Sequence, residues 1–243
     1  MNMIIRLLRN VSLPRIVRNY FEQWWTIMLR PIYFFTLLDK EDWKGKPLTF
    51  LLITSWLLAA LAATVVFILQ FVPIGKTLVV GITGWSFVII LPVLVTLGAT
   101  FYLITLFIVA GLFVCVFFAL LFALSYVLHY CSKMLGGEGD LVNIVQNVFY
   151  CSAVLLVTGL IFILMVLTKN FGLDFSLFRA GANFIEFLIV IYVYGLLAVA
   201  VRKNYGLTKA KAFAVAIVPV LALLIFVVLF DKIALSKLQS WIT

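Results

Sequence analysis

Charged residues are missing from a long central part of this sequence. Positions 77–132 contain no Asp, Glu, Lys or Arg, and only 11% of the 243 residues are charged, whereas soluble domains carry about 25%. The hydrocarbon layer of a bilayer is crossed by about 20 apolar residues, so this stretch alone is long enough for two crossings. The lack of charge therefore excludes a water-soluble core and predicts an integral membrane protein.

Alternation between polar and apolar residues is missing as well. The strands of a membrane-spanning β-barrel need a period of two, but residues 221–230 are apolar on every side. Backbone groups in lipid must be hydrogen-bonded within the protein, which leaves helices as the remaining choice. We therefore expect an all-α membrane protein.

Residues that could support catalysis or bind a metal are scarce. His129 is the single histidine, and the three cysteines have no paired spacing, so a metal would lack ligands. The glycine-rich residues 136–140 lack the Lys-Ser/Thr of a phosphate loop. The sequence also lacks the paired Asp, the Ser/His pair and the HExxH motif of intramembrane proteases. We therefore expect no enzymatic activity, no cofactor and no metal.

Long apolar runs predict a bundle of five transmembrane helices. These predicted spans cover residues 48–72, 100–130, 141–168, 182–201 and 210–230. A further apolar piece, 77–98, is interrupted by Gly and Pro, and we interpret it as a broken or re-entrant helix or as an extra helix.

The two ends of the chain are amphipathic. In residues 1–47 an aromatic-rich apolar stripe lies opposite a charged face, a pattern typical of a segment in the membrane interface. Packing of this segment on the protein's own spans is the alternative. Residues 231–243 predict a short amphipathic tail.

The positive charge selects a topology. The net charge is +9, and the Lys and Arg residues gather at the ends of the apolar spans, so no basic surface domain remains for nucleic acid. If 77–132 crosses once, thirteen Lys and Arg residues lie inside and five outside; if it crosses twice, the numbers are twelve and six, and the basic loop 202–211 is translocated. Short basic loops resist translocation, so we prefer five spans with a cytoplasmic N-terminus and the C-terminus on the opposite side.

Small residues recur at every fourth position of the second predicted span. A ridge of small side chains lets another helix approach closely. Packing within the chain and contact with a second protein both remain open for this ridge. Its members are Gly111, Cys115, Ala119 and Ala123.

Polar residues within the spans are candidate sites. Asn143, Gln146 and Asn147 share one helical face, which suits hydrogen bonding between helices or a contact with a lipid headgroup or a partner. Glu186 lies in the fourth span, where an acid is costly. It either sits at the interface, paired with Arg179, or couples ion movement.

Three short motifs follow one another along the chain. They are a Pro-x-x-aromatic-aromatic segment before the first span, a Gly-Gly-x-Gly turn before the third, and a Lys-Ala turn after the fourth. Their residues are Pro31, Phe34 and Phe35, then Gly136, Gly137 and Gly139, then Lys209 and Ala210. In these motifs and their order the chain resembles the YIP (Ypt-interacting protein) membrane domain, especially its bacterial members, over about residues 30–230.

The resemblance implies five helices, an inside N-terminus and no enzymatic activity, and it favours the bacterial inner membrane. We expect a non-enzymatic scaffold or accessory subunit that organises lipid or docks another membrane or envelope protein, for example in a transport assembly. We expect no nucleic acid as a partner. The alternative is a small ion-coupled transporter or permease subunit, in which 77–98 and Glu186 line the substrate path.

Overall fold

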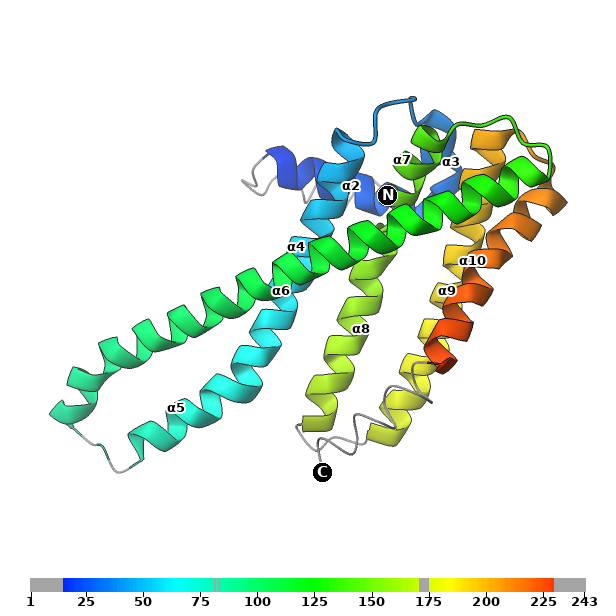
Figure 1. Cartoon of the computed structure of the whole chain (residues 1–243). Coiled ribbons are helices and arrows are strands. Elements are labelled where there is room, and N and C mark those ends of the chain that lie inside the picture. The colour runs from blue at the N-terminus through cyan, green and yellow to red at the C-terminus, as the bar shows by residue number, and fades with distance from the viewer. Residues whose placement is uncertain (1–14, 81, 83, 171–174, 230–243) are drawn as a thin grey trace. The chain divides into compact units, whose positions relative to one another are not determined.

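The computed structural model describes residues 15–80, 82, 84–170 and 175–229, and all regular structure in this part of the chain is helical (Figure 1). The helices are α2 (Arg15–Leu29), α3 (Pro31–Leu37), α4 (Lys46–Val66), the π-helical segment η1 (Phe67–Phe71), α5 (Val72–Val79), α6 (Trp85–Met134), α7 (Leu141–Cys151), α8 (Ala153–Asn170), α9 (Phe175–Tyr205) and α10 (Lys209–Leu229). The expected all-α class is thus confirmed. Residues 1–14 of the predicted amphipathic segment 1–47 and the whole predicted tail 231–243 lie outside the described residues.

Four stretches of the described chain are long and apolar enough to cross a membrane. They are Lys46–Val79, Trp85–Met134, Leu141–Thr168 and Ala180–Tyr205. Their mean hydropathy lies between 2.4 and 3.0, as expected for helices surrounded by hydrocarbon. The apolar helix α10, 21 residues long, coincides with the fifth predicted span.

The chain divides into two compact units. Unit 1 consists of the described residues within 1–48, 120–151 and 188–243, and unit 2 consists of those within 49–119 and 152–187. Both α6 and α9 therefore contribute residues to each unit. The core of unit 1 includes the fully buried side chains of Ile27, Phe35 and Phe149.

The helix boundaries around 77–98 differ from our prediction. The first apolar helix continues through Pro73 to Val79, and α6 runs without interruption from Trp85 through Gly98. Pro73 directly follows the π-helical segment at the start of α5, and a proline inside an apolar helix is tolerated where a local π-type adjustment satisfies the freed backbone groups. Among the described residues of 77–98 no separate helix is seen, because residues 77–79 end α5 and residues 85–98 begin α6.

Gly98 marks a close approach between helices and not the end of a helix. It is buried within unit 2, and a Cβ atom there would lie 2.9 Å from the ring of Phe71. Phe71 in turn stacks on Phe67, with 4.9 Å between the ring centroids. One of the glycines that we interpreted as interrupting 77–98 thus admits an aromatic ring from a neighbouring helix.

The N-terminal helices pack against other parts of unit 1. Tyr20 and Ile27, both on the apolar stripe of α2, are buried. The hydroxyl of Tyr192 in α9 lies 2.8 Å from the carbonyl of Ile27 and 2.9 Å from that of Met28. These hydrogen bonds hold the last turn of α2 against α9.

Candidate docking surface in unit 1

Three connecting segments of unit 1 are held together by hydrogen bonds, and they adjoin the three family-like motifs. The segments are 36–41 after α3, 135–140 between α6 and α7, and 203–211 across the α9–α10 turn. We call these three segments the loop cluster. It brings together residues that are more than 160 positions apart, since Lys203 contacts Thr36.

The Gly-Gly-x-Gly turn is shaped by its contact with the end of α9. A Cβ atom at Gly137 would lie 2.8 Å from Cβ of Tyr205. One at Gly139 would overlap the carbonyl oxygen of Asn204. Gly136 has a φ of +84°, a backbone conformation that favours glycine. The motif therefore requires glycine for a positive φ at one position and for close approach at two others.

Tyr205 is the central side chain of the loop cluster. It is 3% exposed, and its hydroxyl is hydrogen-bonded to Nδ1 of His129 at 2.6 Å. Its carbonyl accepts a hydrogen bond from the backbone N–H of Glu138 at 3.3 Å. Our sequence analysis did not single out Tyr205; its only local signal is a tyrosine at the end of an apolar helix, and a buried tyrosine usually hydrogen-bonds its hydroxyl.

Lysine and asparagine side chains hold the backbone carbonyls of the loop cluster. Lys203 Nζ donates to the carbonyls of Thr36 at 2.6 Å and Leu38 at 3.3 Å. Asn204 Nδ2 donates to the carbonyl of Asp140 at 2.9 Å, and Lys211 Nζ to that of Leu135 at 2.9 Å. The last carbonyls of a helix lack partners within the helix, and cations near them are favourable. The lysines thereby cap the ends of α3 and α6.

One residue of the predicted polar patch is hydrogen-bonded to the loop cluster. Gln146 is 2% exposed; its Nε2 donates to the carbonyl of Asp39 at 2.8 Å and its Oε1 accepts from the N–H of Glu41 at 3.4 Å. Asn147 is also buried, and Asn143 is half-buried. The patch therefore includes one side chain, Gln146, that fixes the charged turn before α4.

The Pro-x-x-aromatic-aromatic motif forms the short helix α3. Pro31 is its first residue, a position that suits proline because no N–H is needed there. Phe35 is fully buried, and Phe34 contacts Tyr150 of α7 edge to face, with 5.1 Å between the ring centroids. The motif therefore anchors α3 on α7.

The other side of α3 is exposed and apolar. Ile32, Tyr33 and Leu37 are 68%, 57% and 61% exposed, and Leu29 at the end of α2 is 56% exposed. An open hollow of about 570 Å³ lies between Leu29 and these residues. We call these four residues the α3 patch.

The ridge residues and Glu186 lie outside the loop cluster, whereas Lys209 and Ala210 belong to its third segment, 203–211. The ridge residues Gly111, Cys115, Ala119 and Ala123 are all exposed on α6. Glu186 is half-buried in α9, and the side chain of Arg179 lies outside the description. Lys209 and Ala210 are exposed at the start of α10. Among the described residues, no three His, Cys, Asp or Glu side chains lie close enough together to hold a metal ion.

These helices define a polytopic, all-α integral membrane protein. The family model described as the Yip1 domain matches residues 25–230, which includes all three motifs and every helix from the middle of α2 to the end of α10. The chain therefore belongs to the Yip1 domain family, as the motifs had indicated. Neither a curated protein nor a solved structure matches the chain.

Proposed function

We propose that this protein is a non-enzymatic membrane scaffold or accessory subunit that docks another membrane protein through the α3 patch. The observation that carries the proposal is the exposure of three large apolar side chains on α3 and of Leu29 beside them, while the opposite side of α3 is anchored by Phe34 and Phe35. Contiguous exposed apolar surface at a fixed site is typical of an interaction surface.

The loop cluster supports this role by holding α3 in one orientation. Lys203 bonds to two carbonyls at the end of α3, and Gln146 holds the turn that follows. A surface that is already ordered loses less conformational entropy when a partner binds. Lys40, within the segment 36–41 of the loop cluster, is exposed, and such a charge at the rim of an interface favours an acidic partner surface or anionic lipid.

The proposed topology has five spans, with α10 as the fifth, in a bacterial inner membrane. The N-terminus and the α9–α10 turn would face the cytoplasm. This arrangement keeps Arg202, Lys203, Lys209 and Lys211 on the side that the positive-inside rule favours. It also leaves 77–98 on the opposite side of the membrane or within its outer leaflet.

Site-specific photo-crosslinking in intact cells tests the docking role. A photoreactive amino acid replaces Tyr33 in the α3 patch, and the matched control places it at Phe187, an equally exposed aromatic of unit 2. We expect one protein partner to crosslink at position 33 and not at 187, and Lys203→Met to reduce that crosslink several-fold while Arg202→Met leaves it unchanged. Crosslinking of position 33 to lipid alone would overturn the proposal.

A further inference from the structure

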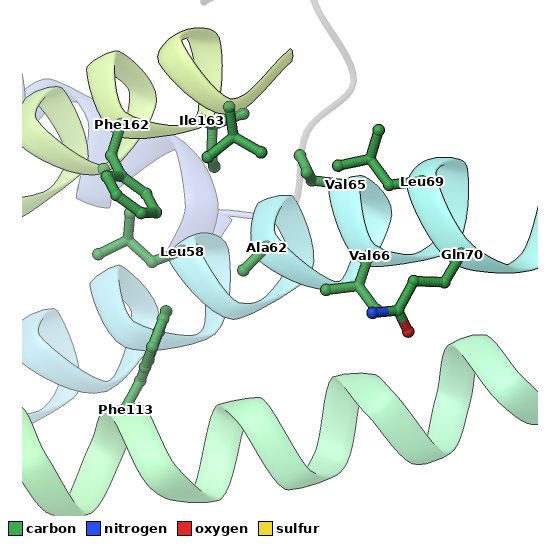
Figure 2. A pocket seen from close by; sticks show the side chains of 11 residues that line it. Leu58, Ala62, Val65, Val66, Leu69, Gln70, Phe113, Phe162 and Ile163 are labelled. Atoms are coloured by element: carbon green, nitrogen blue, oxygen red, sulfur yellow. The ribbon is translucent and has the colours of Figure 1, made fainter. Parts of the chain in front are cut away.

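Unit 2 contains an apolar cavity of about 260 Å³ between three helical segments (Figure 2). Leu58, Ala62 and Val66 line it from α4, Phe113 from α6 and Phe162 from α8. Figure 2 shows Phe113 rising from α6 toward α4 and Phe162 reaching from α8 toward Leu58. Among the described residues that line the cavity, Gln70 carries the one polar side chain, and its carboxamide lies beside Val66.

The cavity exists because the helices are close at one end and diverge at the other. Gly159 of α8 meets the side chain of Leu58 so closely that a Cβ atom at residue 159 would overlap it. Further along, α4 gives way to the π-helical segment Phe67–Phe71, and π segments change which side chains face a neighbour. Phe71 of this segment packs on Phe101 of α6, with 5.6 Å between the ring centroids.

The position of the cavity along the span matches one leaflet of a bilayer. Gln70 lies 24 residues after Lys46, which is about 36 Å along a helix, slightly more than a hydrocarbon layer of about 30 Å. Leu58 lies about 18 Å before Gln70 by the same rise per residue, which is close to half of that layer. With Lys46 at one boundary of the hydrocarbon layer, the amide would lie at the depth of lipid ester groups and the apolar lining at the depth of the chains.

We propose that this cavity binds one acyl chain of a membrane phospholipid, and that the Gln70 amide donates a hydrogen bond to the ester carbonyl of that lipid. Apolar cavities do not hold ordered water, and an empty one would forfeit the dispersion contacts of its lining. A chain from the surrounding bilayer supplies those contacts, while the single amide matches the single polar end of the chain. This site lies in unit 2 and does not depend on the docking role of the α3 patch.

Photolabelling of the full-length protein tests this proposal. The protein is reconstituted into phosphatidylethanolamine–phosphatidylglycerol vesicles that contain a trace of phospholipid with a diazirine at mid-chain, and labelled residues are mapped by mass spectrometry. We expect label to concentrate on 58–70 and 159–166. Ala62→Phe and Val66→Phe each fill the cavity and should remove this label. Ala99→Phe, on an exposed position of α6 that does not line the cavity, is the matched control and should retain it.

Gln70→Leu separates the roles of the amide and the cavity. It keeps the side chain large while removing the hydrogen-bond donor. The same residues should therefore be labelled, but the amount of label should fall about five-fold, as expected for the loss of one hydrogen bond. The proposal is overturned if label spreads evenly over the exposed faces of α4, α6 and α8, or if both cavity-filling variants label as the wild type does. If the cavity-filling variants fail to fold, the map of labelled residues in the wild type and in Gln70→Leu still tests the proposal. Label that is not concentrated on the cavity residues is sufficient to reject it.

Discussion

His129 and Tyr205 are joined by a hydrogen bond of 2.6 Å between the ring Nδ1 and the phenol hydroxyl, across 76 positions of sequence. The ring of Tyr205 also fills the space that Gly137 and Gly139 leave open. One buried side chain thus connects α6, the α6–α7 turn and the end of α9. Tyr205 therefore contributes to the loop cluster beside the hydrogen bonds of Lys203, Asn204 and Lys211.

Substitution of Tyr205 should separate the hydrogen bond of its hydroxyl from the packing of its ring. Tyr205→Phe keeps the ring but leaves Nδ1 of His129 without its partner, so we expect a loss of about 1 kcal/mol in the free energy of unfolding. Tyr205→Ala also opens a cavity beside the glycines, and about 3 kcal/mol should be lost. Unfolding in mild detergent, followed by denaturant titration, measures both. Equal losses for the two variants would mean that the ring itself contributes nothing.

The glycines of the chain should differ sharply in their tolerance of alanine. Gly139→Ala places a methyl group against the carbonyl of Asn204, and such overpacking typically costs about 1–3 kcal/mol. Gly111→Ala meets no atom within 4 Å and should be neutral. Thermal stability of the two variants in the same detergent gives the comparison, and similar melting temperatures would contradict the packing described for the turn.

The small-residue ridge should matter for assembly more than for folding. Gly111, Cys115, Ala119 and Ala123 are exposed along α6, so Ala119→Leu and Ala123→Leu should leave the melting temperature unchanged. If the ridge contacts a second protein, bulky side chains will separate the two helices and reduce co-purification several-fold. Val116→Leu, at a neighbouring exposed position, is the control. Full retention of the partner in both variants would show that the ridge faces lipid.

Glu186 distinguishes a scaffold from an ion-coupled transporter. It is half-buried in α9, and a scaffold has no need of its proton. We therefore expect Glu186→Gln to preserve function and expression, with a stability change of about 1 kcal/mol or less. Function is read out as complementation of a deletion strain. A well-expressed but inactive Gln variant beside an active Glu186→Asp variant would favour coupled transport, because glutamine cannot titrate.

Cysteine labelling will test the five-span topology. In a background without the native cysteines, Lys209→Cys lies at the exposed start of α10 and should react with an impermeant reagent only after the cells are opened. Thr243→Cys should react in intact cells, because five crossings place the two positions on opposite sides. Labelling of position 209 but not of position 243 in intact cells would instead support six spans.

Much of the helical architecture could be predicted from local sequence. The lack of charge over 77–132 and the apolar run before Lys169 are sufficient to identify membrane helices, since no other structure satisfies the backbone in lipid. The three motifs were sufficient to identify the family. In both cases the determining residues are close together in the sequence.

The features that the sequence did not reveal depend on distant partners. Gly98 is one of the glycines that led us to interpret 77–98 as interrupted, although it accommodates Phe71; the sequence alone does not distinguish a glycine that ends a helix from one that admits a neighbouring side chain. Gln146 was recognised as part of a polar face, but its bonds to Asp39 and Glu41 join residues more than a hundred positions away. Gln70 gave no signal, because a lone amide becomes meaningful only beside the cavity that it borders.

The length of α6 has a consequence for the bilayer itself. Its charge-free part, residues 85–132, extends for about 72 Å at the helical rise per residue, more than twice the hydrocarbon thickness of about 30 Å. Lipid around such a helix must accommodate a severe hydrophobic mismatch, by steep tilting of the helix or by local thickening of the membrane. Because each ångström of mismatch costs energy, this protein should partition into thicker membrane regions, and bilayers of short-chain lipid should destabilise it.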